Sequence, residues 1–438
     1  MHVIPRRLLA GFATLLLLLA GWPLHAQLRI EIVGGVARPV PIAIVPFGWQ
    51  GSGPAPFDVA GLIARDLAGS GRFAPLADRD LVQRPTSGTG VDFRDWKMLG
   101  VEAVAVGQLL EAAPGDFTIQ FELFDVLRGQ RLLGYRLPAP AAELRLGAHR
   151  AADMIYEKLT GVPGIFSTRI AYVTATHKGG KPDVFRLVIA DADGANERIM
   201  VESPEPIMSP AWSPDGRKLA YVSFENRVAE VYVQTLRTGT REKISSRAGV
   251  NGSPAWSPDG RMLALTLSRG EGNLDIFTLD LASQMLTRLT DQRSIETEAA
   301  WSPDGRSIFF TSDRAGGPQI YRMPADGGGA QRVTFEGNYN ARPRVSPDGK
   351  RLAMVTNDRG NYRIAVFDLE RGFTQVLTDG RQDESPSFAP NGETLIYATR
   401  EGGRGVLATV SVDGRVRQRI PALEGDVREP AWSPFRVN

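Results

Sequence analysis

Short segments that alternate apolar and polar residues recur along the C-terminal two-thirds of the chain. Examples are "KLAYVS" (218–223), "MLALTL" (262–267) and "SIFFTS" (307–312), each followed after a polar loop by a second apolar segment such as "EVYVQTL" (230–236). Alternation with a period of two residues is typical of β-strands that pack face to face. The pattern therefore predicts many short strands in this part of the chain.

An octapeptide precedes these strands and divides the region into equal units. "PAWSPDGR" (210–217) returns as "PAWSPDGR" (254–261), "AAWSPDGR" (299–306), "PRVSPDGK" (343–350), "PSFAPNGE" (386–393) and a truncated "PAWSP" (430–434). Its third residue, which we call the marker, falls at Trp212, Trp256, Trp301, Val345, Phe388 and Trp432, at intervals of 44, 45, 44, 43 and 44 residues. That period suits one four-stranded blade of a β-propeller.

The residue types of the octapeptide occur both in turns and in reactive sites, and the arrangement favours a turn. In Ser-Pro-Asp-Gly the proline fixes φ, the aspartate bonds nearby backbone and the glycine tolerates positive φ. We therefore expect it to join the first and second strands of each blade, with the tryptophans packed between blades. Five such turn positions around a ring, four aspartates and Asn391, cannot all be general acids for one substrate. One carboxylate per turn also supplies too few oxygen ligands for calcium.

The two ends of the repeat region complement each other. Five full units start near residues 209, 253, 298, 342 and 385, whereas residues 166–208 contain the later strands of a unit without its first. The isolated "EPAWSP" (429–434) supplies the missing strand. We predict a sixth blade built from both ends of the domain, which closes the ring and removes the open sheet edges.

Residues 27 to about 160 lack this period and predict a small α/β domain. "QLRIEIV" (27–33), "PIAIVPF" (41–47) and "GVEAVAVGQL" (100–109) read as strands, and residues 117–137 as a hairpin. Helices are predicted over 58–73 and 142–161, the second with one apolar face. Gly161 and Pro163 form a helix stop. The predicted organisation is an N-terminal α/β domain over 27–162, followed over 163–438 by a six-bladed β-propeller closed by pairing of its N- and C-terminal strands.

Residues 1–26 have the features of a secretory signal peptide. Arg6 and Arg7 precede an apolar run from Leu8 to Ala20, which is shorter than a membrane-spanning helix requires. We expect cleavage after about Ala26 and an exported mature chain that is not inserted in the membrane. Without the signal the chain has 49 basic and 49 acidic residues, which gives no support to nucleic-acid binding.

Few residues of the mature chain are suited to catalysis or metal binding. It contains two histidines, His149 and His177, no cysteine, and no G-x-S-x-G nucleophile motif. No cofactor or metal is expected, and a binding module is favoured. The alternative is a propeller hydrolase, or a propeller that binds a small ligand in its central channel. Side chains that are far apart in the sequence can form such a site once the chain is folded.

The chain resembles the TolB family of the Tol-Pal system in Gram-negative bacteria. The resemblance rests on "MSPAWSPDGRKLAYVSFE" (208–225), "PIAIVPF" (41–47), "EKLTGVPGIFSTRIAYV" (157–173) and the final "PAWSP". It implies a non-catalytic periplasmic adaptor that supports outer-membrane integrity and constriction during cell division. The implied partners are the lipoprotein Pal, TolA, and other outer-membrane or periplasmic proteins.

The same resemblance implies where these partners bind. TolA is assigned to the segment that includes Gln27, Leu28, Arg29, Ile30, Glu31 and Ile32. This segment is alternatively an edge strand of the first domain, and the two uses could alternate. Pal is assigned to the connectors between blades, at Val250, Asn251, Thr297, Glu298 and Arg342. These residues are alternatively solvated loop residues, and charge reversal at Glu298 or Arg342 is expected to weaken Pal binding without lowering the melting temperature.

Overall fold

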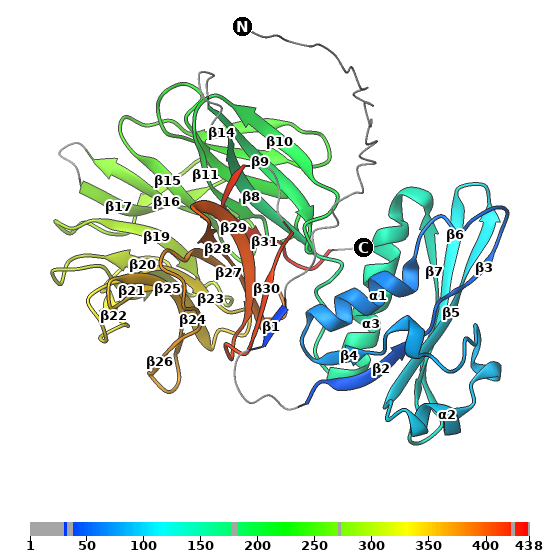
Figure 1. Ribbon diagram of the computed structural model, residues 1–438. Coiled ribbons are helices and arrows are strands. Elements are labelled where there is room, and N and C mark those ends of the chain that lie inside the picture. Colours follow the sequence, from blue (N-terminus) through cyan, green and yellow to red (C-terminus); the bar gives the residue numbers. More distant parts are fainter. Residues whose placement is uncertain (1–29, 33–37, 177–182, 270–272, 422–424, 437–438) are drawn as a thin grey trace, which may run out of the picture.

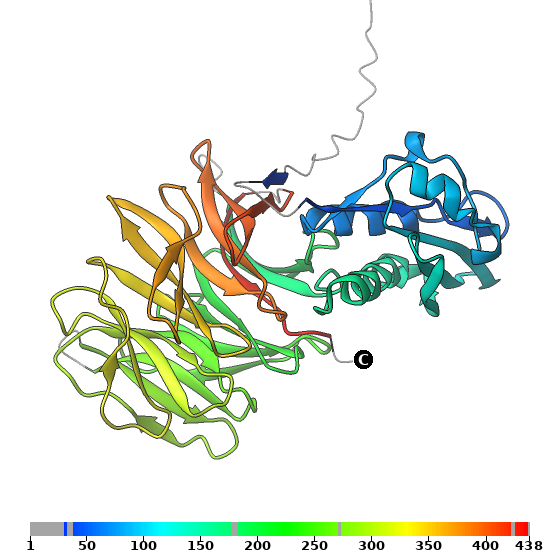
Figure 2. The ribbon, with the colours of Figure 1, turned by 90° about the horizontal axis from the view of Figure 1, so that it is seen from below.

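The computed structural model describes residues 30–32, 38–176, 183–269, 273–421 and 425–436. Figures 1 and 2 show an α/β domain beside one edge of a β-propeller. The predicted signal peptide and residues 27–29 lie outside the described residues. No helix within the described ranges is both long and apolar enough to cross a membrane.

The α/β domain is built on one mixed sheet. Its strand order is β4-β2-β5-β6-β7, and β3 also pairs with β5. The β2–β4, β2–β5 and β3–β5 pairs are parallel and the other two are antiparallel. The strands are β2 (Val40–Ile44), β3 (Gly48–Gln50), β4 (Phe73–Pro75), β5 (Ala103–Ala113), β6 (Asp116–Asp125) and β7 (Gln130–Pro140).

Helices cover both faces of this sheet, so its central strands are apolar on both sides. The helices are α1 (Val59–Gly69), α2 (Phe93–Met98) and α3 (Leu144–Thr160), with 3-10 turns at Asp78–Asp80, Gly88–Gly90 and Ala141–Glu143. Ile42 and Ile44 of β2 pack in the core that contains α1 and α3, and Ala43 packs with Trp96 of α2. The strands predicted over 41–47, 100–109 and 117–137 and both predicted long helices are confirmed, whereas α2, β3 and β4 were not predicted.

The described residues of the second domain form the sheets of six blades. Each sheet has four propeller strands, and in one of them the inner strand comes from the C-terminus. The strands are β8 (Arg169–Thr176), β9 (Val184–Asp191), β10 (Arg198–Ser203), β11 (Ile207–Trp212), β12 (Lys218–Ser223), β13 (Glu230–Thr235), β14 (Arg241–Ser245), β15 (Asn251–Trp256), β16 (Met262–Arg269), β17 (Asn273–Asp280), β18 (Leu286–Arg288), β19 (Glu296–Trp301), β20 (Ser307–Ser312), β21 (Gln319–Pro324), β22 (Gln331–Arg332), β23 (Asn340–Val345), β24 (Arg351–Asp358), β25 (Asn361–Asp368), β26 (Thr374–Val376), β27 (Glu384–Phe388), β28 (Thr394–Glu401), β29 (Arg404–Ser411), β30 (Val416–Arg419) and β31 (Asp426–Trp432).

The octapeptide forms the turn between the first two strands of a blade, as predicted. In its first copy the Ser213 hydroxyl donates to Asp215 Oδ1 at 2.6 Å, and the Arg217 amide donates to the same oxygen at 3.0 Å. Gly216 has φ 66°. The aspartate is therefore occupied within its own turn, which is a structural role.

Three tryptophans of the octapeptide connect their blades to the neighbouring blade. Trp256 and Trp301 donate their indole N–H to the carbonyls of Ala211 and Ala255, each at 3.1 Å, and Trp212 reaches Ala431 across the closure at 3.0 Å. Burying a ring of this size removes roughly 150–250 Å² from water, and the hydrogen bond satisfies its one polar group. The predicted packing between blades is confirmed.

The ring closes as the sequence predicted. Strand β31 pairs antiparallel with β8, so the last strand of the chain completes the blade β10-β9-β8-β31. The Trp432 indole donates to Thr168 Oγ1 at 2.8 Å, where the chain enters the propeller. The fold class, an α/β domain followed by a closed six-bladed propeller, is confirmed.

The N-terminal strand β1 (Ile30–Ile32) lies on the propeller. It pairs antiparallel with β30, with Ile30, Glu31 and Ile32 opposite Gln418, Arg417 and Val416. The alternative that this segment is an edge strand of the first domain is therefore wrong. The unpaired outer edge of β30 offers backbone donors and acceptors to an extended segment, and linear sequence contains no signal for this pairing.

Candidate functional site

Six residues with left-handed backbone surround the central channel. They are Ser209, Ser253, Glu298, Arg342, Ser385 and Glu429, with φ between 47° and 58°, and all line one hollow of the channel. Each lies three residues before the marker position of its octapeptide, where the register between the first two strands of the blade shifts. Positive φ is unusual for residues other than glycine. The repeated bulge turns these side chains toward the axis.

Glu298 and Arg342 form the charged centre of this ring. Arg342 Nε lies 2.8 Å from Glu298 Oε1, and Arg342 Nη2 lies 3.6 Å from Glu429 Oε1. The Arg342 amide also donates to Glu298 Oε2 at 3.0 Å. Burial opposes the charge on Arg342, but the neighbouring carboxylates more than compensate and raise the pKa of its guanidinium. The side chains are 19% and 27% exposed for Glu298 and Arg342, so the pair is largely desolvated.

The pair lies between two hollows of the channel. One hollow, of about 420 Å³, is lined by residues that include Tyr339, Tyr362 and Arg400. The other, of about 350 Å³, is lined by octapeptide residues such as Pro214 and Trp256. Glu298 and Arg342 line both hollows. We call the first the mouth hollow and the second the turn-face hollow.

The five residues assigned to Pal occupy different environments. Val250 is 43% exposed and Thr297 is half-buried on β19. Asn251 is buried, and its side chain bonds Ser245 and the backbone of Arg247. The alternative of solvated loop residues does not describe Asn251, or the Glu298–Arg342 pair. Because both side chains are partly buried and bonded to each other, we now expect charge reversal at this pair to lower stability as well.

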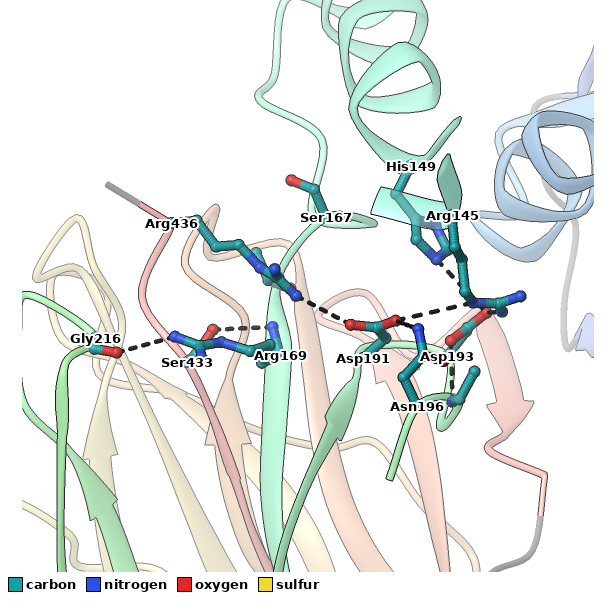
Figure 3. A network of polar contacts seen from close by, with 12 residues as sticks. Arg145, His149, Ser167, Arg169, Asp191, Asp193, Asn196, Gly216, Ser433 and Arg436 are labelled. Carbon is teal, nitrogen blue, oxygen red and sulfur yellow. Dashed lines mark hydrogen bonds and ion pairs between the residues drawn. The ribbon is translucent and has the colours of Figure 1, made fainter. Parts of the chain in front are cut away.

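The two domains meet through a polar network, seen in Figure 3. Arg145 of α3 contacts Asp193 in the turn after β9, and its Nε lies 3.8 Å from Asp191 Oδ2. Arg436, near the C-terminus, lies 3.0 Å from the other oxygen of Asp191. His149 of α3 is buried and lies 3.8 Å from Asp193. The network borders a cavity of about 840 Å³ between the domains.

Asp66, His149 and Asp193 bring their ligand atoms within 4.8 Å of one another. However, His149 Nδ1 lies 2.7 Å from Asp66 Oδ2, and Arg145 already compensates Asp193. The arrangement is that of an ion-pair bridge between domains. Among the described residues, Asp66, His149 and Asp193 are the one group of three potential ligands close enough together to hold a metal ion. His177 lies outside the described residues.

The segment that connects the domains is held by one carboxylate. Asp153 of α3 accepts the backbone N–H groups of Phe166 at 2.7 Å and Ser167 at 3.1 Å. Burial raises the pKa of the Asp153 carboxyl to about 6, although these hydrogen bonds lower it. The segment that leads from α3 into the propeller is therefore bonded, at Phe166 and Ser167, to a carboxyl group whose pKa is about 6.

Substitution Asp153→Asn should change how stability depends on pH. The folded-state pKa of Asp153 lies above its ordinary value. Between about pH 4 and pH 6 the folded protein therefore keeps a proton on this carboxyl that the unfolded chain has lost. The stabilisation from this group is complete below pH 4 and is lost as pH rises through 6. We expect the unfolding free energy of D153N, relative to wild type, to rise by up to about 3 kcal/mol between pH 4 and pH 7. Urea unfolding at both pH values tests this, with Asp326→Asn, at an exposed position, as the control. A constant difference would contradict it.

Sequence reasoning missed the domain junction. Arg145, Asp191, Asp193 and Arg436 are far apart in the chain and carry no shared motif. The channel ring did have a signal, since its residues precede the marker of each octapeptide by a constant three positions.

The fold and the site define a two-domain propeller scaffold whose channel mouth is lined by polar and aromatic side chains. The family profile of the TolB amino-terminal domain matches residues 28–132, and that of the TolB beta propeller domain matches residues 156–436. Proteins named Tol-Pal system protein TolB from Xanthomonas euvesicatoria and Xanthomonas campestris are each 51% identical over 436 residues, covering 99% of both chains. The crystal structure of TolB from Acinetobacter baumannii is 42% identical, with a TM-score of 0.85 over 93% of this chain and 100% of that one.

The chain belongs to the TolB family and is a component of the Tol-Pal system.

Proposed function

We propose that this protein is a non-catalytic periplasmic adaptor that binds Pal at the mouth of its propeller and TolA through its N-terminal segment. In this role it supports outer-membrane integrity and constriction during cell division, after cleavage of a signal peptide near Ala26. The observation that carries the proposal is the mouth hollow of about 420 Å³, lined by aromatic and charged side chains, in a chain of this family.

The chemistry of the mouth hollow suits a protein surface. Tyr339 and Tyr362 pack edge to face with ring centroids 5.1 Å apart, and Tyr362 is 39% exposed. Arg400 and Arg428 also line the hollow. Tyrosine and arginine are enriched among residues that dominate binding energy at protein interfaces. The linings of the mouth and turn-face hollows, as far as the chain is described, include no histidine, which favours binding over a hydrolase that uses the channel.

Substitution Val250→Asp should weaken Pal binding without unfolding the protein. Val250 is exposed beside the first strand of its blade, so a charge there is solvated in the free protein and buried in the complex. We expect the Kd for the soluble domain of Pal to rise about tenfold or more, which is about 1.4 kcal/mol. Titration calorimetry of residues 27–438 measures it.

The matched control for this test is Val82→Asp, because Val82 is also exposed, at 54%, but lies in the α/β domain. Its affinity for Pal should equal that of the wild type. Failure of the wild type to bind Pal at all would contradict the adaptor proposal. Equal weakening by both substitutions would contradict the placement of the Pal site at the mouth.

The N-terminal segment can bind a partner by adding a strand to the partner's sheet. Strand β1 already uses its backbone in this way against β30, at Ile30, Glu31 and Ile32. A strand paired with β30 is unavailable to TolA, so docking and release of this segment would control TolA binding. The competing site is therefore on the propeller and not on the first domain.

Locking β1 onto β30 should abolish TolA binding. The double substitution Ile32→Cys and Val416→Cys places thiols at paired positions in a chain without cysteine. We expect the oxidised form to lose TolA binding at least tenfold and the reduced form to regain it, as measured by calorimetry with and without reductant. The single substitution Ile32→Cys is the control.

Deletion of residues 27–35 should abolish TolA binding under both conditions. Unchanged binding after this deletion would remove the assignment of TolA to the segment. Unchanged binding by the oxidised double variant would remove only the alternation between docked and released states.

A further inference from the structure

One repeat has an arginine at a position that lines the central channel, where the other repeats have a small residue. The residue that precedes the marker is alanine at 211, 255, 300 and 431 and serine at 387, but arginine at 344. All six positions line the turn-face hollow. Five small residues leave space at this level of the channel, and one guanidinium extends into it. Because the other five repeats have a small residue at this position, the blade itself does not require an arginine at 344.

The surroundings of Arg344 are partly apolar and partly polar, because tryptophans and prolines line the hollow together with serines, Glu298 and Glu429. The hollow measures about 350 Å³, at the small end of the range for ligand pockets. Trp256 and Trp301 line it, together with Pro214 and Pro258 of the octapeptide turns. Flat aromatic and proline surfaces of this kind suit a compact apolar group.

The guanidinium of Arg344 lacks a counter-ion. Its Nη1 donates to the carbonyl of Pro343 at 2.9 Å, and in the described part of the chain no carboxylate lies within 4.0 Å of its nitrogens. Burial lowers the pKa of Arg344, with a further contribution from Arg342, although Glu298 and Glu429 oppose it. A partly desolvated cation without an ion-pair partner is unfavourable, and an anion placed beside it would be stabilised.

The nearby carboxylates are already engaged elsewhere. Glu298 is bonded to Arg342 and to the hydroxyl of Thr311, at 2.8 and 3.0 Å. Glu429 accepts the backbone N–H of Ser209 and lies 3.6 Å from Arg342. Both acids are therefore held by other donors, and neither forms the missing pair with Arg344.

We propose that the turn-face hollow is a binding site for a small monocarboxylate with an apolar body, with Arg344 holding the carboxylate and the tryptophan-lined wall holding the body. The planar guanidinium matches a carboxylate through two parallel hydrogen bonds. A phosphate dianion fits less well, because Glu298 and Glu429 stand close enough to repel a second negative charge. The Glu298–Arg342 pair lies between this site and the mouth hollow, so the site is separate from the proposed Pal site.

The test is a titration of the mature protein with N-acetyl-L-leucine, followed through its tryptophan indole ¹H–¹⁵N resonances. Saturable shifts are expected for Trp256 and Trp301, which line the hollow. N-acetyl-L-leucine amide, which keeps the body and removes the charge, should bind at least tenfold more weakly. Inorganic phosphate should also bind at least tenfold more weakly.

Arg344→Ala is the decisive variant, since it restores the residue that other repeats carry. It should raise the Kd for N-acetyl-L-leucine at least tenfold while the melting temperature stays within a few degrees of wild type, and Arg344→Lys should retain part of the affinity. Arg359→Ala removes an arginine of the same blade whose side chain is 94% exposed and does not line the hollow, and it should bind as wild type does. Absence of saturable shifts, binding unchanged in R344A, or tighter binding of phosphate or of the amide would each overturn the proposal.

Discussion

Deletion of residues 426–438 is expected to abolish cooperative folding of the propeller. The deletion removes β31, which pairs with β8 and provides the inner strand of the closing blade. It also removes Val427 and Trp432 from the core of that blade and the Arg436–Asp191 pair from the domain junction. Loss of one buried tryptophan side chain alone costs about 3–5 kcal/mol. The total stability of a protein is typically about 5–15 kcal/mol, so removal of the whole strand should exceed what the ring can lose.

The measurement is thermal unfolding followed by near-ultraviolet circular dichroism, because this signal reports packed aromatic rings. The wild type should show the cooperative transition of the propeller, and the truncated chain should keep at most the signal of the α/β domain, which has its own core around Trp96. Deletion of residues 437–438, which leaves β31 complete, is the control and should unfold as the wild type does. A truncated chain that keeps a transition within a few degrees of wild type would show that closure by β31 is dispensable.

Charge reversal Glu298→Arg should destabilise the propeller by about 3 kcal/mol or more. Removing one partner of a largely desolvated ion pair leaves the other charge without compensation. In this variant Arg342 would face a second cation, and its backbone N–H would lose the carboxylate that accepts it at 3.0 Å. The Thr311 hydroxyl, which donates to the same oxygen at 3.0 Å, would also lose its acceptor.

Urea unfolding measures this loss, and the double substitution Glu298→Arg with Arg342→Glu should recover part of it by restoring opposite charges. The control is Glu370→Arg, because Glu370 lies 3.9 Å from Lys350 and both side chains are more than 60% exposed. An exposed pair of this kind contributes about 0–1 kcal/mol. Equal effects of E298R and E370R would show that the channel pair is not structurally important. For the same reason, loss of Pal binding in E298R should be interpreted only at temperatures where the variant is folded.

Most of the fold followed from the sequence because its determinants are local and repeated. A period of two in "KLAYVS" and its counterparts defines which face of each strand is buried, and Ser-Pro-Asp-Gly defines where each hairpin turns. The constant interval between markers such as Trp212 and Trp256 gave the number of blades. The orphan "PAWSP" at 430–434 gave the closure, since one strand was missing at the other end of the domain.

The partner sites depended on resemblance, and the structure altered what their residues are expected to do. From the sequence, Glu298 and Arg342 were expected to be surface charges, because the neighbouring residues in the chain do not show whether a charged side chain is buried. Their pairing joins the first strands of two neighbouring blades, so it exists only once these blades pack together. Asn251 likewise reads as an exposed loop residue, but its amide is buried and holds the turn at Arg247.

The sequence by itself determined the blades, their turns, their closure and the α/β character of the first domain, because alternation, turn chemistry and period act between neighbours in the chain. Only the tertiary structure decided that β1 pairs with β30, that Arg145 bridges α3 to Asp193, and that Arg344 stands in the turn-face hollow without a counter-ion. These contacts join residues from distant parts of the chain. Their energies depend on burial and on the distance between charges, which are properties of the folded molecule.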